Sequence, residues 1–251
     1  MSRHTDEEVL WHRLDRLFIQ AIRQYGLIED NDRILVGVSG GKDSLALIDL
    51  LARRMRIFKP RFSVVAAHIV MRNIPYQSDV EYLRRFAEER GVLFVTVETE
   101  FDETTDSRKS PCFLCSWTRR KRLFDLAKQH QCNKIALGHH QDDILHTLLM
   151  NMTFQGAFST MPPRLKMDKF DMTIIRPLCL IPEKDLVILC NEQEYQLQIK
   201  NCPFEKESHR SEMKAVFAGL EKLNPQARFS LWKSMTNIQP DYLPAEDTLK
   251  L

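Results

Sequence analysis

A run of six small, polar and charged residues is the part of this 251-residue sequence best suited to chemistry. The run consists of Ser39, Gly40, Gly41, Lys42, Asp43 and Ser44. It follows a short apolar segment and precedes a leucine-rich segment of helical period, which predicts a glycine turn between a strand and a helix. Backbone N–H groups and the helix dipole converge in such a turn, which suits a polyphosphate. The glycines permit close approach, the lysine supplies positive charge, and the serines supply hydroxyl groups.

Asp43 is the unexpected member of this loop, because a phosphate repels a carboxylate. The repulsion is relieved only if the carboxylate binds a metal ion, carries a proton or caps a helix N-terminus. The loop also departs from the common nucleotide pattern G-x-x-x-x-G-K-[ST], since Asp43 follows Lys42 and Val36 occupies the first glycine position. An ordinary strand-to-helix turn is the alternative interpretation. Six specified residues in a strand–helix context disfavour it.

Cys112 and Cys115 form a C-x-x-C pair just before a predicted helix at 116–130. N–H groups at a helix start favour the thiolate form. The pair has four possible interpretations: a redox dithiol, a structural zinc site, an iron–sulfur cluster or accidental spacing. The redox fold and the second C-x-x-C of a zinc site are both missing from the sequence. Cys202 lies in a turn-like Lys-Asn-Cys-Pro-Phe context that suits a ligand.

The other three cysteines lie in or beside apolar runs, so we predict that they pack in the core; they are Cys132, Cys179 and Cys190. A disulfide framework is not expected in a chain of this length with no secretory features.

A local basic patch surrounds the C-x-x-C pair. Its members, with no acidic residue among them, are Arg108, Lys109, Arg119, Arg120, Lys121 and Arg122. Because the formal net charge is only +2, a nucleic-acid surface must be local. A solvated helix face is the usual explanation of such a run. Trp117 is suited to stacking on a base, although an aromatic residue at helical spacing more often belongs to the core.

Strands and helices alternate along the sequence. Predicted strands cover 33–38, 62–69, 92–97, 134–137 and 172–176, and predicted helices cover 7–25, 42–55, 77–90, 116–130, 144–152 and 183–194. This alternation predicts an α/β fold with a five-stranded parallel sheet and helices on both faces. Ligands of such sheets bind beyond the carboxyl ends of the strands. The loop at 39–44, His68 and the turn Gly138–Asp143 all fall at those ends.

We divide the chain into an N-terminal amphipathic helix (1–28), an α/β domain carrying the C-x-x-C pair (29–200) and a helical extension carrying Cys202 (201–251). The extension has predicted helices at 209–223 and 226–235. No apolar run approaches the roughly 20 residues that cross a bilayer, and the N-terminus lacks signal-peptide features. We therefore expect no membrane partner and a cytoplasmic location.

The loop at 39–44 resembles the S-G-G-x-D-S pyrophosphate loop of the PP-loop ATP pyrophosphatases. Over nearly its whole length the sequence is similar to the TtcA-like branch of that family, the tRNA 2-thiocytidine synthetases. The similar stretches are 32–34 with the loop, the C-x-x-C with its basic helix, 136–143, 175–178 and 234–240. This resemblance implies a Rossmann-like fold of the adenine nucleotide α-hydrolase type.

The resemblance also implies cofactors and partners. It implies a [4Fe-4S] cluster on Cys112, Cys115 and Cys202, although many members have a second C-x-x-C followed by Gly-Ser-Gln where this chain has only Cys202. It implies that ATP with Mg²⁺ adenylates O2 of a tRNA cytidine at position 32, and that sulfur replaces O2 with release of AMP and pyrophosphate. A cysteine desulfurase as sulfur donor and a homodimer are implied as well.

Roles for individual residues follow from this resemblance. The catalytic candidates are Lys42, Asp43 and Asp142, the two aspartates to hold Mg²⁺ or to position the base. The ATP-binding candidates are the six loop residues with His68 and Gly138, and the tRNA-binding candidates are the six residues of the basic patch. We expect Asp143 to cap the helix that follows, and His139 and His140 to be structural.

Three other functions share some of these sequence features. A tRNA(Ile)-lysidine synthetase shares the loop but needs no cysteine cluster, so the C-x-x-C pair argues against it. A cluster-bearing 2-thiouridine synthetase usually adds zinc-binding C-x-x-C pairs at both ends, which this chain lacks. A nucleotide- or RNA-binding module without catalysis is disfavoured by the intact motifs at 39–44 and 138–143.

Overall fold

The computed structural model describes residues 5–74, 76–102, 110–167, 170–200 and 210–243. The chain forms two compact units. The larger contains Met1–Ile144 and Met161–Ser208, and the smaller contains Leu145–Thr160 and His209–Leu251. The predicted boundaries at residues 28 and 200 stay predictions.

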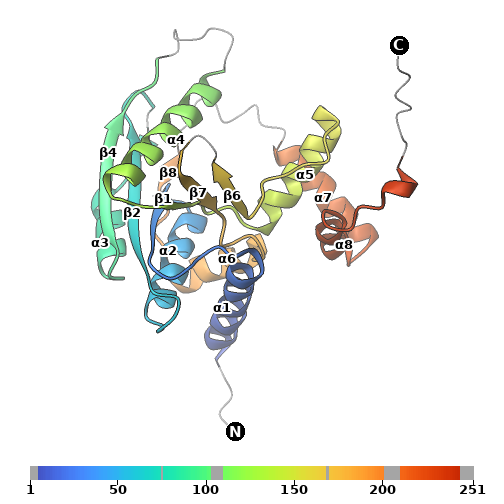
Figure 1. Ribbon diagram of the computed structural model, residues 1–251, viewed down its shortest axis with the longest axis horizontal. Helices are drawn as coiled ribbons and strands as arrows, with labels where there is room; N and C mark the ends of the chain where they lie inside the picture. Colours follow the sequence, from blue (N-terminus) through green and yellow to red (C-terminus); the bar gives the residue numbers. More distant parts are fainter. Residues whose placement is uncertain (1–4, 75, 103–109, 168–169, 201–209, 244–251) are drawn as a thin grey trace. The chain divides into compact units, whose positions relative to one another are not determined.

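A six-stranded sheet forms the centre of the larger unit, in the order β4-β2-β1-β5-β7-β6 (Figure 1). Its strands are β1 (Asp32–Val38), β2 (Phe62–Met71), β4 (Leu93–Thr99), β5 (Lys134–Ala136), β6 (Arg164–Met167) and β7 (Met172–Ile175). All neighbours pair in parallel except β6 and β7. A separate pair joins β3 (Tyr76–Gln77) to β8 (Ile199–Lys200). The predicted α/β fold and its five parallel strands are confirmed.

The sixth strand was not predicted. The first three residues of β6 are exposed, so the strand lacks the apolar signal that marks a buried one. It adds antiparallel to β7 at the sheet edge, where partial solvation is tolerated. The sheet is therefore mostly parallel rather than wholly so.

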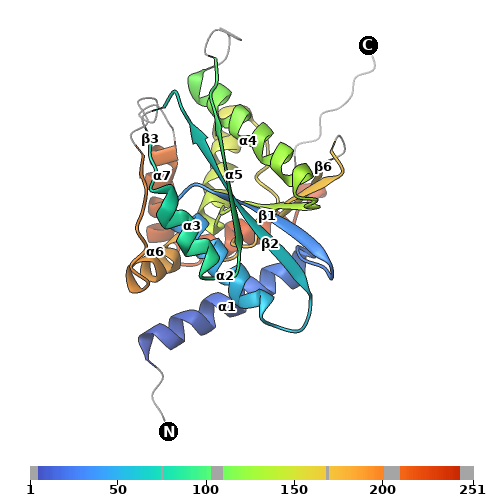
Figure 2. The ribbon, with the colours of Figure 1, turned by 90° about the vertical axis from the view of Figure 1, so that its left-hand side faces the viewer.

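Helices cover both faces of this sheet. The helices of the larger unit are α1 (Asp6–Tyr25), α2 (Lys42–Met55), α3 (Val80–Glu88), α4 (Pro111–Gln129) and α6 (Glu183–Glu192), together with the start of α5 (Gln141–Gln155). Figure 2 shows α4 on one side of β1 and β2, with α2 and α3 on the other. On the α4 side Leu35 and Val65 share an apolar cluster with Phe124. On the opposite side α2 packs against β1, β2 and α6, and α1 packs against α6.

Two helix boundaries differ from prediction in an informative way. The helix expected at 116–130 starts at Pro111, because Ser110 Oγ accepts the Phe113 N–H at 3.3 Å and proline occupies the first turn. The C-x-x-C pair therefore lies inside the first turn. The helix expected at 77–90 is shorter, because Asp79 caps it by accepting from the Tyr82 N–H at 2.9 Å.

The first helix follows its predicted amphipathic pattern. Leu10, Leu14 and Phe18 are buried along one side of α1. A capping box between Thr5 and Glu8 starts the helix, and Gly26 ends it in a left-handed conformation.

The cysteines predicted for the core, Cys132, Cys179 and Cys190, are buried, which confirms that prediction. Burial raises the pKa of the Cys179 thiol to about 12 and raises those of Cys132 and Cys190 as well. These three side chains are therefore uncharged thiols at neutral pH.

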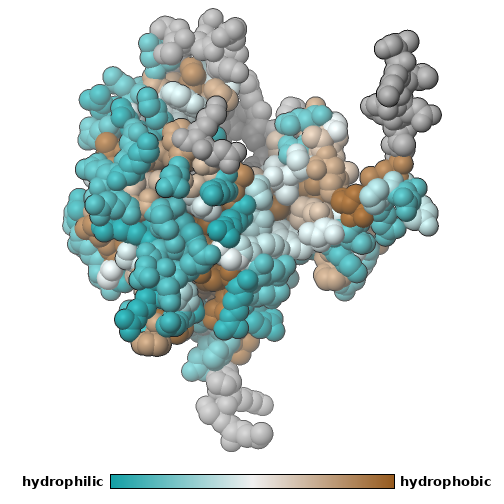
Figure 3. All heavy atoms as spheres, in the orientation of Figure 1, coloured by the Kyte–Doolittle hydropathy of each residue, from teal (hydrophilic) through white to brown (hydrophobic). Residues whose placement is uncertain are grey.

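The smaller unit contains the later part of α5, with α7 (Arg210–Leu223), α8 (Ala227–Ser234) and the short η2 (Pro240–Tyr242). The His146 ring meets the edge of Phe217 with centroids 5.4 Å apart, and the Arg228 guanidinium lies over Phe217. The two helices predicted after residue 208 are thus present. Within the described part of the chain, every helix is too short or too polar to cross a bilayer. Figure 3 shows hydrophilic residues over most of the visible face of the larger unit.

Candidate active site

The loop at 39–44 leaves the carboxyl end of β1 and enters α2 at Lys42. Gly40 has a φ of +77°, which side-chain-bearing residues rarely adopt. A Cβ at Gly40 would lie only 2.1 Å from Cγ of Gln198. Position 40 therefore requires glycine for two reasons, the left-handed backbone conformation and the close approach of the Gln198 side chain.

The carbonyl groups of the two loop glycines are occupied by protein donors. Gly40 O accepts from the Gln198 N–H at 3.1 Å, and Gly41 O accepts from Ser44 Oγ at 2.9 Å. N–H groups in the first turn of a helix, by contrast, have no acceptor within the helix. The loop thus presents donors rather than acceptors to a ligand, as an anion requires. Ser39 Oγ lies 3.3 Å from the Gly41 N–H and 3.4 Å from Ser44 Oγ.

His68 fixes the end of β1 from the neighbouring strand. Its ring is almost fully buried, with Nδ1 2.8 Å from Val38 O and Nε2 3.1 Å from Ser78 Oγ. Since a carbonyl only accepts, Nδ1 carries the hydrogen and Nε2 accepts from the serine hydroxyl. Burial lowers the pKa of His68, although the bond to Val38 opposes this. His68 is therefore a neutral structural support beneath the loop.

The lowered pKa of His68 predicts a pH dependence of stability. Near pH 6 the unfolded chain binds more protons at this residue than the folded chain. The stability from neutral His68 is therefore present above about pH 6.5 and is lost as the pH falls below it. Asparagine offers a donor and an acceptor without this titration. We expect His68→Asn to lose less free energy of unfolding than the wild type between about pH 7.5 and about pH 5.5, measured by urea denaturation. Equal losses in both proteins would contradict this account.

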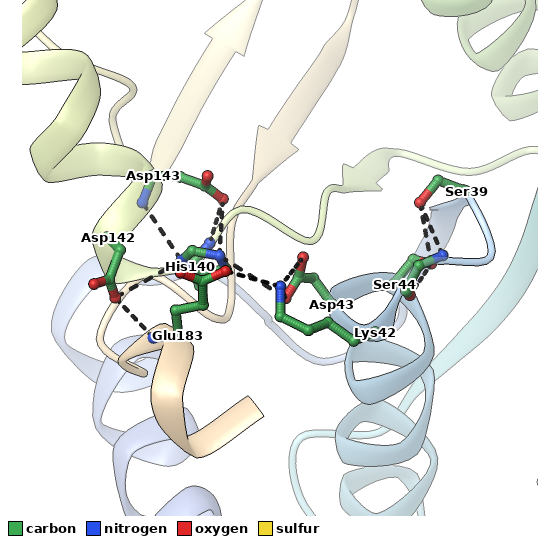
Figure 4. A network of polar contacts seen from close by, with 9 residues as sticks. Ser39, Lys42, Asp43, Ser44, His140, Asp142, Asp143 and Glu183 are labelled. Carbon is green, nitrogen blue, oxygen red and sulfur yellow. Dashed lines mark hydrogen bonds and ion pairs between the residues drawn. The ribbon is translucent and has the colours of Figure 1, made fainter. Parts of the chain in front are cut away.

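Lys42 lies beside the loop between two carboxylates (Figure 4). Its Nζ is 3.2 Å from Asp43 Oδ1 and 3.1 Å from Glu183 Oε1. Burial alone would lower the pKa of Lys42, but the charges of Asp43 and Glu183 outweigh it and raise that pKa. The lysine is therefore positively charged where a phosphate would approach.

A second loop, Gly138–Asp143, touches the first. A Cβ at Gly138 would lie 3.1 Å from the carbonyl carbon of Asp43 and 3.2 Å from the Ser44 nitrogen, so a larger residue would push the two backbones apart by a few tenths of an ångström. His140 is buried between the loops, and its Nε2 lies 3.9 Å from Asp43 Oδ1 and 3.6 Å from Asp143 Oδ2. His140 thus links the two loops, and a structural role was expected for it.

The two adjacent aspartates have different partners. Asp143 Oδ2 accepts from the His140 N–H at 3.1 Å at the start of α5, as expected of a helix cap. Asp142 is buried, and its Oδ2 accepts from the Glu183 N–H at 2.7 Å at the start of α6. Asp142 therefore joins the start of α5 to the start of α6, and its catalytic role stays a prediction.

In the part of the chain that the structure describes, no three His, Cys, Asp or Glu side chains are grouped to hold a metal ion. A complete Mg²⁺ site built from protein ligands alone is therefore not formed there. Mg²⁺ commonly completes its shell with water and substrate phosphates, so Asp43 and Asp142 stay candidates as partial ligands.

A cavity of about 120 Å³ opens beside the loop between β1, β2 and α4. Ala67, Leu123 and Leu137 contribute apolar walls, and Ser39 and Arg119 contribute polar ones. An apolar slot next to a phosphate loop suits the base of a nucleotide.

The basic patch is divided by this arrangement. Arg119 lines the cavity, whereas Arg120, Lys121 and Arg122 are exposed. Arg122 bonds to Thr99 Oγ1 at 3.2 Å. Arg108 and Lys109 lie outside the described residues. Of the six residues of the basic patch, three are therefore both described and exposed, namely Arg120, Lys121 and Arg122. Their role in RNA binding stays a prediction.

Trp117 is exposed rather than part of the core. Lys121 Nζ lies 5.6 Å from its ring centroid. An exposed aromatic ring beside cationic side chains is available to stack on an unpaired base.

The C-x-x-C pair lies at the opposite end of α4 from its buried C-terminal turn. Cys112 is exposed and Cys115 is half-buried, while Leu114 between them is buried and anchors the turn. Cys115 and Arg119 are four residues apart, so they share one side of the helix. Cys115 is therefore about one helical turn from the cavity-lining Arg119, and Cys112 about two turns. Cys202 lies outside the described residues, so its distance from the pair is untested.

Two residues of this site were missed in the sequence. Glu183 pairs with Lys42, and its only signal was a position after Pro182 at a helix start. Gln198 covers Gly40, and no local signal marked it because its partner is remote in the sequence.

Comparisons with known proteins bear on this geometry. A model of the PP-loop domain family matches residues 12–201. A tRNA-cytidine(32) 2-sulfurtransferase of Geotalea daltonii is 36% identical over 243 residues, covering 94% of this chain and 96% of the relative. A protein of that name from Bdellovibrio bacteriovorus is 35% identical over 239 residues, covering 94% and 92%. Among solved structures, the U34-tRNA thiolase NcsA from Methanococcus maripaludis with its [4Fe-4S] cluster is similar, with a TM-score of 0.73 and 26% identity, over 92% of this chain and 80% of that chain.

Proposed function

Because the chain belongs to the PP-loop family, and within it to the family of tRNA-cytidine(32) 2-sulfurtransferases, we propose that it is an ATP-dependent tRNA thiolase. Its substrate is a tRNA cytidine, at position 32 of the anticodon loop, and its product is the 2-thiocytidine. The observation that carries this proposal is the loop at 39–44, in which the carbonyl groups of Gly40 and Gly41 are occupied by protein donors and Lys42 is charged.

The loop supports cleavage of ATP between its α and β phosphates. In this reaction O2 of the cytidine bonds to the α phosphorus, and the bond to the pyrophosphate oxygen breaks. Charge builds on the leaving pyrophosphate, where the loop N–H groups and Lys42 stabilise it. Asp43 lies at the contact of the two loops, and Asp142 lies at the end of the second loop beside the start of α6. The two are proposed to share Mg²⁺ with the phosphates. Adenylation makes O2 a good leaving group, so a sulfur nucleophile can replace it at C2 and release AMP.

The C-x-x-C pair supports a cluster as the source of that sulfur. Thiolates are the ligands that iron–sulfur clusters use, and Cys112 and Cys115 stand at a helix start, which favours thiolates. We propose that these two cysteines hold a [4Fe-4S] cluster with Cys202, as the family resemblance implies. When bound through three cysteines, such a cluster would leave one iron open to supply sulfur. The cluster of the similar thiolase NcsA supports this assignment.

The remaining parts of the proposal concern partners. Exposed Arg120, Lys121 and Trp117 are proposed to meet the tRNA, because basic and aromatic side chains together suit an RNA loop. We propose a cytoplasmic location, because the proposed substrate is a tRNA. A cysteine desulfurase as sulfur donor and a homodimer stay predictions.

Nucleoside analysis tests the proposal. We expect the anaerobically reconstituted protein, given tRNA, ATP, Mg²⁺ and a sulfide source, to form 2-thiocytidine with one AMP and one pyrophosphate released per modification. Mass spectrometry of the digested tRNA identifies the base. 2-Thiouridine in place of 2-thiocytidine would instead support the activity named for the solved neighbour. If the assay yields neither thionucleoside and no AMP, the proposal is refuted.

A further inference from the structure

A short segment after α6, which we call the strap (Glu194–Gln198), connects the core of the larger unit to the pyrophosphate loop. Its first anchor is Tyr195, a buried residue whose hydroxyl donates to Asp49 Oδ2. Asp49 in turn accepts from Arg90 Nε at 2.6 Å. The Tyr195 ring meets Phe86 edge-on, with centroids 5.3 Å apart. Burial and the Asp49 carboxylate raise the pKa of Tyr195, so its hydroxyl stays a donor.

The strap is also held by α3. The Tyr82 hydroxyl accepts from the Gln196 N–H at 3.1 Å. At the end of the strap, Gln198 Oε1 accepts from the Asp79 N–H, and Gln198 Nε2 donates to Gln196 O at 3.2 Å. Both polar ends of the Gln198 side chain are therefore fixed by protein partners.

Fixing this side chain places Gln198 directly against the loop. Its own N–H donates to Gly40 O at 3.1 Å, and its Cγ occupies the space beside the Gly40 α-carbon. Gly40 is the residue whose φ of +77° gives the loop its turn. One residue of the strap thus holds a loop carbonyl and packs against the most unusual backbone conformation in the loop.

Gln198 and His68 both hold backbone carbonyl groups of the loop region, and their own partners, Asp79 and Ser78, are adjacent in the sequence. His68 bonds to Val38 O and to Ser78, and Gln198 bonds to Gly40 O and to Asp79. A carbonyl left without its donor could rotate toward the bound phosphate and repel it. Holding carbonyls on both sides of Ser39 keeps the donor groups of the loop available.

We propose that the strap keeps the pyrophosphate loop in its anion-binding conformation, with Gln198 as a positioning residue that does not itself touch ATP. That the anion is ATP rests on the proposed function, whereas the effect of the strap on the loop conformation does not. The motif at 39–44 alone does not predict that the loop depends on the strap, because the supporting residues lie about 150 positions away along the chain.

Gln198→Ala in the full-length protein tests this inference. We expect amide hydrogen exchange at Gly41 and Ser44, whose N–H groups bond within the loop, to be about fivefold faster in the nucleotide-free protein. This is the ratio that follows from losing about 1 kcal/mol of hydrogen bonding. We expect the Kd for a non-hydrolysable α,β-methylene ATP with Mg²⁺ to rise by a similar factor, about fivefold. Tyr195→Phe, which keeps the ring and removes the anchor hydroxyl, is expected to change both values in the same direction.

Gln196→Ala is the matched control, because its side chain is exposed and only its backbone takes part in the strap. Wild-type exchange and affinity are expected for it, and an equal effect would overturn the role of the Gln198 side chain. Unchanged loop exchange in Gln198→Ala would overturn the proposal, even with weakened binding, since Gln198 would then be a ligand contact. If the wild type binds no ATP analogue, the proposed function fails, and loop exchange alone decides the role of the strap.

Discussion

Cys112→Ala is expected to abolish tRNA thiolation and cluster binding while leaving the fold and nucleotide binding intact. Cys112 is exposed in the first turn of α4, and the buried Leu114 anchors that turn instead. Removing the Cys112 thiol therefore takes away a ligand without removing core packing. Iron and acid-labile sulfide content of anaerobically purified protein, measured beside the nucleoside assay, checks this expectation.

Cys132→Ala is the control for this experiment. Cys132 is buried just beyond the other end of α4, and burial raises its pKa, so it is a packed thiol rather than a thiolate ligand. We expect normal iron and sulfide with a stability loss of about 1 kcal/mol. Cys202→Ala, measured in parallel, tests the third ligand. Unchanged iron and sulfide in Cys112→Ala would exclude Cys112 as a cluster ligand. Zinc without sulfide in the wild type would exclude the cluster and favour a redox or persulfide-carrying pair.

Local motifs account for most of what the sequence predicted correctly. The loop at 39–44 was recognisable because its residues, the strand before it and the helix after it are contiguous. Buried strands such as β1 and β2 were recognisable because both faces are covered and apolar residues run along them. The approach of the loops at Gly138 followed from the general rule for parallel sheets, which brings strand ends together.

Features that depend on remote partners were not predictable. Asp142 looks the same in the sequence whether it holds a metal ion or caps a helix, and only the fold brings the start of α6 to it. Arg119 is one of four consecutive basic residues, but the approach of α4 to β1 and β2 turns it into the cavity. Gln198 has no signal at all in its neighbourhood. In each case the role is assigned by tertiary contact rather than by spacing.

Gly40→Ala is expected to weaken nucleotide binding by at least about tenfold, an effect of about 1.4 kcal/mol or more, and to abolish thiolation. Two separate costs add at this position. A φ of +77° costs a side-chain-bearing residue about 1–2 kcal/mol. The new Cβ would also lie 2.1 Å from Cγ of Gln198, so either the strap or the loop must move. Calorimetric titration with the ATP analogue measures the loss.

Gly219→Ala separates this loop effect from a general effect of replacing glycine. Gly219 lies on α7 in the smaller unit, and a Cβ there meets no heavy atom of the described residues within 4 Å. Alanine should stabilise that helix by about 0.5–1 kcal/mol and leave nucleotide binding unchanged. The double variant Gly40→Ala with Gln198→Ala removes the 2.1 Å contact with Cγ but leaves a 3.0 Å contact with Cβ of residue 198. It also keeps the backbone cost and loses the Gln198 side-chain anchor, so we expect it to remain defective. Normal binding by Gly40→Ala would show that the loop does not need this turn, and the assignment of residues 39–44 as the pyrophosphate site would then fail.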